Sequence, residues 1–226
     1  MSERFYFRQL LAGRDFATDD PVARQMANFV YLVGDRTTGE ALVVDPAYDP
    51  QGLLDVLAAD DMRCVGAVAS HYHADHIGGS MMGFELAGIV SLLELVDVPV
   101  HAQRDETDFI TQVTSIGSDA LTLHSGSSTV EVGGLSIDVI HTPGHTPGSQ
   151  CLLVENRLVT GDTLFLHGCG RTDLPGGDAS MLYHSLHHTL ARVSDDVAVC
   201  PGHDYADVPT ASFGAVRATN PVLVTH

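Results

Sequence analysis

Short apolar runs separated by turn residues predict a chain of alternating strands and helices. Residues 28–34 and 41–44 are β-rich runs on either side of a turn at 35–39, which predicts an antiparallel hairpin. Residues 64–69 form another apolar run, which predicts a buried strand directly before a histidine-rich segment. Later strands are predicted at 98–101, 120–123, 129–132, 135–140, 150–154, 158–160 and 197–200.

Apolar residues at helical spacing predict the helices between these strands. One helix is predicted over 51–59, and another begins at Asp178 as its N-cap. The apolar positions of the second helix recur at intervals of four, four and three: Leu182, Leu186, Leu190 and Val193. Further helices are predicted near 89–96 and 104–113, and the acidic residues at the start of the latter are expected to favour its N-terminal dipole. We therefore expect two facing sheets with helices outside, in one α/β domain over residues 1–226.

The charge of the chain excludes several kinds of function. Among 226 residues there are 29 acidic residues against 11 arginines and no lysine, so the formal net charge is −18. A P-loop, a lysine Schiff base and a lysine general base are therefore excluded. So acidic a surface argues against nucleic acid or an anionic membrane as a partner, and favours a small-molecule substrate. Whether the chain forms a homo-oligomer stays open.

The termini and cysteines predict a cytoplasmic protein. The first eight residues contain no apolar signal segment, and the apolar stretch at 89–100 is interrupted by Glu94 and Asp97. The four cysteines form no CxxC motif, which argues against a zinc knuckle, and a disulfide framework is not expected in a chain of this length.

Four candidate metal ligands occur within six positions directly after the predicted strand at 64–69. They are His71, His73, Asp75 and His76. Alternation along an extended chain makes His71 and His73 point the same way. The Gly78–Gly79 pair then lets the chain turn, so that the other two face the same point. Imidazole and carboxylate together are suited to zinc, iron or manganese.

Three further candidates each follow an apolar run and lie beside a glycine. His145 lies in a segment with the sequence HTPGHTPG, Asp162 in TGDT, and His203 in PGHD. Taken singly, such a residue is more often a turn or capping residue, but three together indicate a site. No GxSxG motif is present, so we expect no serine nucleophile of that type.

The motifs HYHADH, HTPGHT, TGD and PGH, in this order, resemble the metallo-β-lactamase-fold superfamily. The resemblance implies a four-layer αββα sandwich, with metal at one edge of the sheets. It implies that one metal ion is bound by His71, His73 and His145. It implies a second bound by Asp75, His76 and His203, with Asp162 between the two. We therefore expect two Zn²⁺ ions per chain.

A pair of divalent ions supplies hydrolytic chemistry without a side-chain nucleophile. Two ions about 3.5–4 Å apart share a water molecule and lower its pKa towards about 7, which supplies a metal-bound hydroxide at neutral pH. Asp75 is the candidate catalytic residue, because its carboxylate can orient the hydroxide and then carry its proton.

Residues 168–178, with the sequence GCGRTDLPGGD, are similar to two branches of that superfamily. One branch is the glyoxalase II-like hydrolases, which implies a small thioester such as a hydroxyacylglutathione as substrate. The other is the persulfide dioxygenases, which implies one Fe²⁺ held by His71, His145 and Asp162. We favour the hydrolase and keep the dioxygenase as the alternative, with lactone or β-lactam hydrolysis less favoured.

Two residues and one segment each have two interpretations. Arg171 is either a substrate contact or the ion-pair partner of Asp173. Tyr205 is either a substrate contact or a packed aromatic residue. The stretch from Met81 to Asp105 carries extra residues compared with the expectation for the persulfide branch. Within it, the segment from Phe84 to Val96 is either a lid over the pocket or a contact between subunits.

Overall fold

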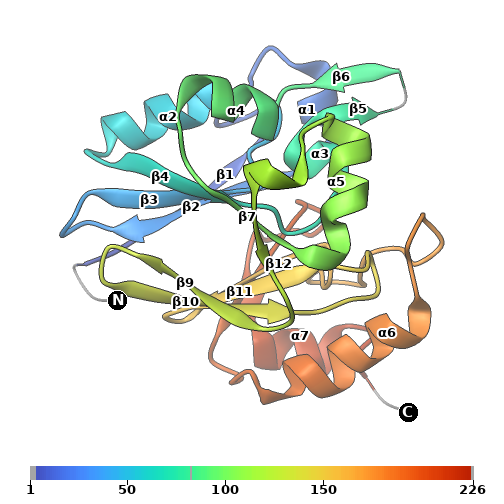
Figure 1. The fold of residues 1–226 in the computed structure, drawn as a ribbon. Helices are drawn as coiled ribbons and strands as arrows, with labels where there is room; N and C mark the ends of the chain where they lie inside the picture. Colours follow the sequence, from blue (N-terminus) through green and yellow to red (C-terminus); the bar gives the residue numbers. More distant parts are fainter. Residues whose placement is uncertain (1–3, 82, 225–226) are drawn as a thin grey trace.

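Two six-stranded sheets face each other in the computed structural model, which describes residues 4–81 and 83–224 (Figure 1). The first sheet has the order β1 (Phe5–Leu11), β2 (Phe29–Asp35), β3 (Glu40–Val44), β4 (Arg63–Val68), β7 (Val100–Gln103) and β8 (Leu121–His124). The second has the order β14 (Ala211–Ser212), β13 (Ala198–Pro201), β12 (Arg157–Gly161), β11 (Gln150–Val154), β10 (Leu135–His141) and β9 (Ser128–Val132). The predicted hairpin of β2 and β3 is antiparallel, with Leu32 opposite Val43.

Helices cover the outer face of each sheet, which confirms the expected αββα sandwich (Figure 1). Those on the side of the first sheet are α1 (Pro21–Met26), α2 (Pro50–Ala59), α3 (Ala74–Ile77), α4 (Ile89–Leu95) and α5 (Thr107–Thr114). Those on the side of the second sheet are α6 (Ala179–His184) and α7 (Phe213–Thr219). Short 3₁₀ turns occur at Arg104–Glu106, Ser118–Ala120 and Leu190–Arg192, and a separate hairpin pairs β5 (Gly79–Met81) with β6 (Phe84–Leu86).

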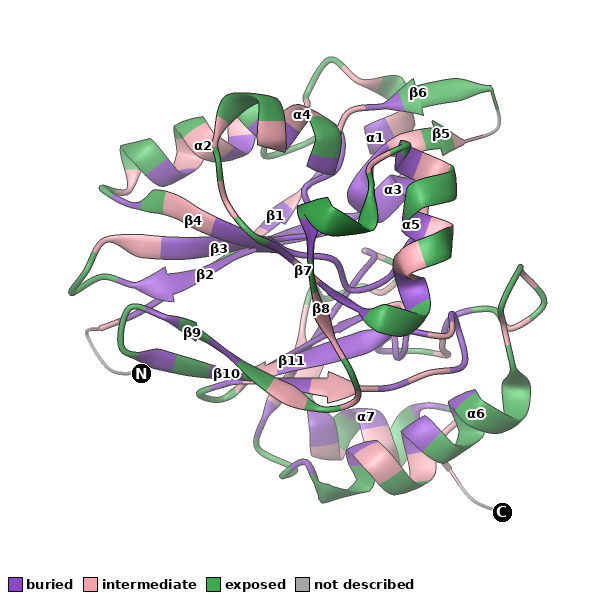
Figure 2. Ribbon diagram, in the orientation of Figure 1, coloured by how far each residue is buried: buried purple, intermediate pink, exposed green. Residues whose placement is uncertain are grey.

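Alternation along the strands divides the apolar side chains between two layers. Phe29, Tyr31 and Val33 of β2 pack between the sheets, whereas Val30 and Leu32 pack against the outer helices. Successive side chains of a strand point to opposite faces, so a strand buried on both faces is apolar throughout. The strands of both sheets accordingly carry long stretches of purple buried residues, whereas buried and exposed residues alternate along the outer helices (Figure 2).

Strand direction brings four functional segments to one edge of the sandwich. β12 pairs in parallel with β13, and β10 and β12 both pair antiparallel with β11, so these three strands run in the same direction. The carboxyl ends of β4, β10, β12 and β13 lead into the segments that contain the seven candidate ligands. Residues far apart in the chain therefore meet where these strands end.

The helix predicted from Asp178 is confirmed at its start. The Asp178 carboxylate accepts hydrogen bonds from the N–H groups of Ser180 and Met181. The α-helical geometry ends at His184, and a π-helical turn over Ser185–Thr189 continues the same buried face.

Several elements were not expected from the sequence pattern: β1, α1, α3, the β5–β6 hairpin, β14 and α7. All of these have seven residues or fewer, so they show too few repeats for a period to be recognised.

The segment from Met81 to Asp105 is largely an ordinary part of the sandwich. Its α4 buries Ile89 and Leu92 against β4 and β7, and β7 itself joins the first sheet. Of the Phe84–Val96 segment for which a lid was predicted, only β6 remains a candidate, because it pairs with β5, whose Met81 borders the cavity described below. No helix in the described ranges is long and apolar enough to cross a membrane. The cytoplasmic location and the oligomeric state stay predictions.

Candidate metal centre

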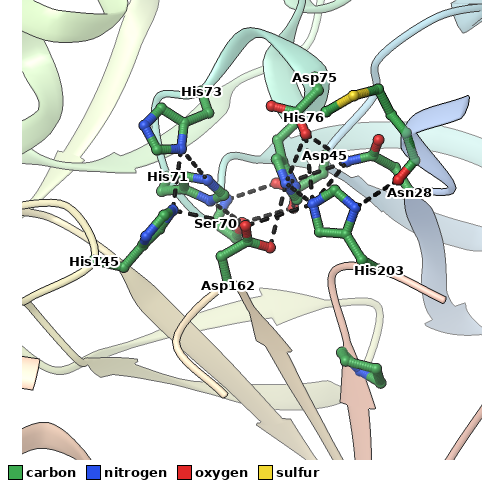
Figure 3. A network of polar contacts seen from close by, with 12 residues as sticks. Asn28, Asp45, Ser70, His71, His73, Asp75, His76, His145, Asp162 and His203 are labelled. Atoms are coloured by element: carbon green, nitrogen blue, oxygen red, sulfur yellow. Dashed lines mark hydrogen bonds and ion pairs between the residues drawn. The ribbon is translucent and has the colours of Figure 1, made fainter. Parts of the chain in front are cut away.

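Three imidazole nitrogens meet at the end of β4 and β10. Nδ1 of His73 lies 3.0 Å from Nε2 of His71 and 3.0 Å from Nε2 of His145 (Figure 3). His71 and His145 are buried, and His73 is partly exposed to the cavity. This cluster is the first of the two implied ligand sets.

The second set lies beside it. Nε2 of His76 is 3.2 Å from Nε2 of His203, and Oδ2 of Asp75 is 3.5 Å from His203 and 3.6 Å from His76. All three residues are buried. Asp75 is held by the Asn28 side chain, whose Nδ2 donates to Oδ2 over 3.1 Å.

Asp162 lies between the two sets. Its carboxylate oxygens are 3.4 Å from His76, 3.6 Å from His145 and 3.5 Å from His203. Oδ1 is buried and accepts no hydrogen bond from any described residue, although the His76 ring is nearby. A buried carboxylate oxygen without a donor is costly unless a cation satisfies it.

Hydrogen bonds on the outer sides of the rings determine which nitrogens are free to bind metal. Nδ1 of His145 donates to the carbonyl of Arg171 over 2.7 Å, and Nδ1 of His203 donates to the carbonyl of Met26 over 2.8 Å. A carbonyl only accepts, so both rings carry their proton on Nδ1 in these contacts. Their Nε2 lone pairs consequently point into the centre.

Asp45 fixes two further rings in the same way. It accepts from Nδ1 of His76 over 2.9 Å and from the Ser70 hydroxyl over 2.6 Å. Because Ser70 gives its only hydroxyl proton to Asp45, its oxygen accepts from Nδ1 of His71 over 3.0 Å. Asp45 has a φ of 59°, a left-handed conformation that is uncommon for residues with a side chain and that occurs at sites where surrounding contacts hold it.

The donor set fits divalent metal. Nε2 lone pairs of four histidines, Nδ1 of His73 and two carboxylates converge within contact distance. Neutral imidazole and carboxylate are ligands that zinc accepts in a catalytic site. Three groups of described residues have ligand atoms within 4.8 Å of one another: His71, His73 and His145; His71, His76 and Asp162; Asp75, His76 and His203.

Burial and neighbouring charge shift the pKa values of these groups in opposite directions. Burial lowers the pKa of His71 well below its ordinary value, and it lowers that of His73 to about 4. Burial also disfavours charge on His76, but the carboxylates of Asp162 and Asp75 raise its pKa well above the ordinary value. The paired carboxylates therefore favour a positive charge at this point, which a metal ion supplies when bound.

A cavity of about 520 Å³ opens onto both ligand sets. Arg171 and Tyr205 both line it, as does Tyr72. Arg171 also forms a bidentate ion pair with Asp173, as its second interpretation predicts, and the N–O distances are 2.9 and 2.8 Å. The Tyr205 ring stacks on His203, with centroids 4.6 Å apart and an interplanar angle of 11°.

The prediction that strand alternation makes His71 and His73 point the same way is wrong. β4 ends at Val68, so alternation along that strand does not orient His71 and His73. His73 is instead the N-cap of the one-turn helix α3, which contains Asp75 and His76. The set converges because a loop and a helical turn follow the strand.

Sequence reasoning also missed Asp45, Ser70 and Asn28, which hold the ligands. Asp45 directly follows the apolar run at 41–44, and no local motif links it to residues 25 to 31 positions away. Glu106 is one of the acidic residues expected at a helix start to favour its dipole, but its side chain is buried and its Oε1 accepts the N–H of Gly148 over 2.6 Å.

Comparison with known proteins agrees with this geometry. The family described as "Metallo-beta-lactamase superfamily" matches residues 23–203. This chain belongs to the metallo-β-lactamase superfamily.

Relatives in the superfamily bear two different functional names. The human mitochondrial persulfide dioxygenase ETHE1 is 32% identical over 225 residues, covering 96% of this chain and 81% of that protein. The hydroxyacylglutathione hydrolase of Shewanella halifaxensis is 33% identical over 201 residues, covering 88% and 70%. The crystal structure of ETHE1 from Myxococcus xanthus superposes with a TM-score of 0.77 at 31% identity, covering 96% of this chain and 84% of that one.

Proposed function

We propose that this superfamily member is a binuclear metal hydrolase that acts on a small thioester, with zinc as its metal. The observation that carries the proposal is the presence of two separate clusters of three ligands, joined by Asp162. His73, Asp75, His76 and His203 would have no metal to bind if the centre held a single ion on the other three residues.

Zinc held by the two ligand sets would supply a water molecule of lowered pKa and would polarise the carbonyl of the thioester. The chain's own contribution to proton transfer is Asp75, which borders the cavity. Asn28 donates to its Oδ2, and the Tyr48 hydroxyl donates to Oδ1 of Asn28 over 2.7 Å. This chain of hydrogen bonds holds one Asp75 oxygen in place, so that the carboxylate can receive a proton and return it to the leaving thiolate.

Arg171 and Tyr205 are the proposed substrate contacts. Both border the cavity, and Tyr205 extends its wall beside the proposed ligand His203. The stacked ring limits the approach of water from that side, and it presents an apolar face to the substrate.

The test is metal analysis together with thioester hydrolysis by the same preparation. We expect two zinc ions per chain and hydrolysis of S-lactoylglutathione or of an uncharged thioester such as S-butyryl-N-acetylcysteamine. Asp108→Asn, which changes an exposed carboxylate on α5, is the matched control and should behave as the wild type. One iron per chain without thioesterase activity would contradict the proposal.

A mononuclear iron persulfide dioxygenase is the second candidate. It is favoured by the 32% identity to the human persulfide dioxygenase over nearly the whole chain. Here one Fe²⁺ would be held by His71, His145 and Asp162, which leaves positions open for oxygen and sulfur. Oxygen uptake by iron-loaded protein given glutathione persulfide would support this candidate in place of the hydrolase, and absence of uptake would remove it.

A further inference from the structure

The cavity beside the metal centre is walled mainly by uncharged side chains. Six of its apolar or aromatic lining residues come from separate parts of the chain: Met26, Tyr72, Met81, Val113, Phe165 and Leu174. All the acidic and histidine residues in the described lining belong to the proposed metal centre. An apolar wall of this kind gains free energy from covering hydrocarbon and offers nothing to a charged group.

Arg171 is the single arginine among the described lining residues, and its charge is already paired. Its Nε and Nη2 donate to the two oxygens of Asp173, and both side chains are 69% exposed. An incoming carboxylate would have to replace Asp173 at this guanidinium. Exposed ion pairs contribute little free energy, so exchanging Asp173 for a substrate carboxylate would hardly favour binding of that carboxylate in the cavity.

We propose, on the basis of the hydrolase function above, that the substrate carries an uncharged, apolar acyl group and that this group occupies the cavity lined by Met81, Val113 and Leu174. The chain's net charge of −18 also disfavours substrates with extra carboxylates at the mouth. Because the preference concerns the acyl group, it should appear with any thiol, provided that the same thiol is used for every thioester in the series.

The first experiment compares thioesters of N-acetylcysteamine that differ only in the acyl group. From acetyl to hexanoyl, kcat/KM should rise about fourfold for each methylene that enters the cavity, because each buried methylene contributes about 0.8 kcal/mol. Succinyl, which ends in a carboxylate, should be at least about tenfold poorer than butyryl. Equal rates along the series, or a preference for succinyl, would overturn the proposal.

Variants of the lining residues show whether the cavity causes the preference. Met81→Gln and Leu174→Gln should each reduce the gain per methylene to about twofold or less, because an amide replaces part of the apolar wall. Phe84→Gln is the matched control: Phe84 pairs with Met81 in the β5–β6 hairpin, is exposed, and does not line the cavity. An unchanged gain in both lining variants would contradict the assignment of the acyl group to this cavity.

Binding without turnover separates this inference from the hydrolase proposal. Calorimetry with S-butyl-N-acetylcysteamine and its 3-carboxypropyl counterpart, both thioethers that cannot be hydrolysed, should show at least tenfold tighter binding of the butyl compound. If no thioester is hydrolysed but this ratio holds, the hydrolase proposal fails and the apolar preference stands. If thioesters are hydrolysed and the carboxypropyl compound binds as tightly, the preference is wrong.

Discussion

Glu106 should make the stability of this protein fall as pH rises, and replacing it by glutamine should remove that dependence. Its side chain is 1% exposed at the end of the 3₁₀ turn before α5. Oε1 accepts the Gly148 N–H, while Oε2 is buried and has no hydrogen-bond partner among the described residues. Burial raises the pKa of Glu106 from 4.5 to about 7, although the hydrogen bond from the Gly148 N–H opposes the shift.

The sign follows from which form the folded chain prefers. A raised pKa means that the folded protein favours the neutral carboxyl, so the stabilisation is complete below about pH 4.5 and is lost as pH rises through about 7. With 1.36 kcal/mol for each pKa unit, the free energy of unfolding should fall by about 2 to 3 kcal/mol between pH 5 and pH 8 through this group alone.

Urea unfolding at a series of pH values measures the effect. The wild type and Glu106→Gln are compared in the presence of a chelator, so that metal binding adds no pH dependence. Glutamine keeps an oxygen for the Gly148 N–H but carries no titratable proton. The difference in unfolding free energy between the two proteins should therefore change by about 2 to 3 kcal/mol across the pH range, whatever its value at pH 5.

Asp108→Asn is the control for this comparison, because it alters an exposed carboxylate on the neighbouring turn of α5. It should follow the wild-type profile. Parallel curves for the wild type and Glu106→Gln would show that Glu106 is not buried in its neutral form, and would refute the assignment.

Three further predictions concern the metal centre. Asp162→Ala and His145→Ala should each lower thioester turnover more than about a hundredfold while circular dichroism shows a folded chain, and near-normal turnover in either would remove that ligand from the site. Asp45→Asn should weaken zinc binding about 10- to 100-fold in a competition titration, because the asparagine side chain would no longer orient His76 and Ser70 as the carboxylate does. An unchanged affinity would show that these contacts do not tune the ligands. Chelation should lower the free energy of unfolding by about 4 kcal/mol relative to protein with free zinc at a thousand times Kd, and equal melting temperatures would indicate that no metal is bound.

Much of the architecture could be predicted from local pattern. The β2–β3 hairpin, α2 and the helix that begins at Asp178 were each located within a few residues, because their apolar periods and end residues are local signals. β1 has apolar residues on both sides of Arg8 and was missed, and the four-residue helix α3 is shorter than any recognisable period.

The sequence by itself determined which residues could form a metal centre. His71, His73, Asp75 and His76 are adjacent in the chain, and the order of the later motifs identified the superfamily. These signals can be recognised in the sequence alone because they depend on residue type and short spacing. They also limited the chemistry, since a chain without lysine cannot use a lysine amine as its nucleophile or base.

Only the tertiary structure decided how those residues are held and what surrounds them. The inward direction of the imidazole lone pairs depends on Asp45 and on the carbonyls of Met26 and Arg171, which are distant from the rings in sequence. The burial of Glu106 and the apolar wall of the cavity likewise arise where separate segments pack together. Hydrogen bonding and desolvation act between neighbours in space, and no local period along the chain encodes those neighbours.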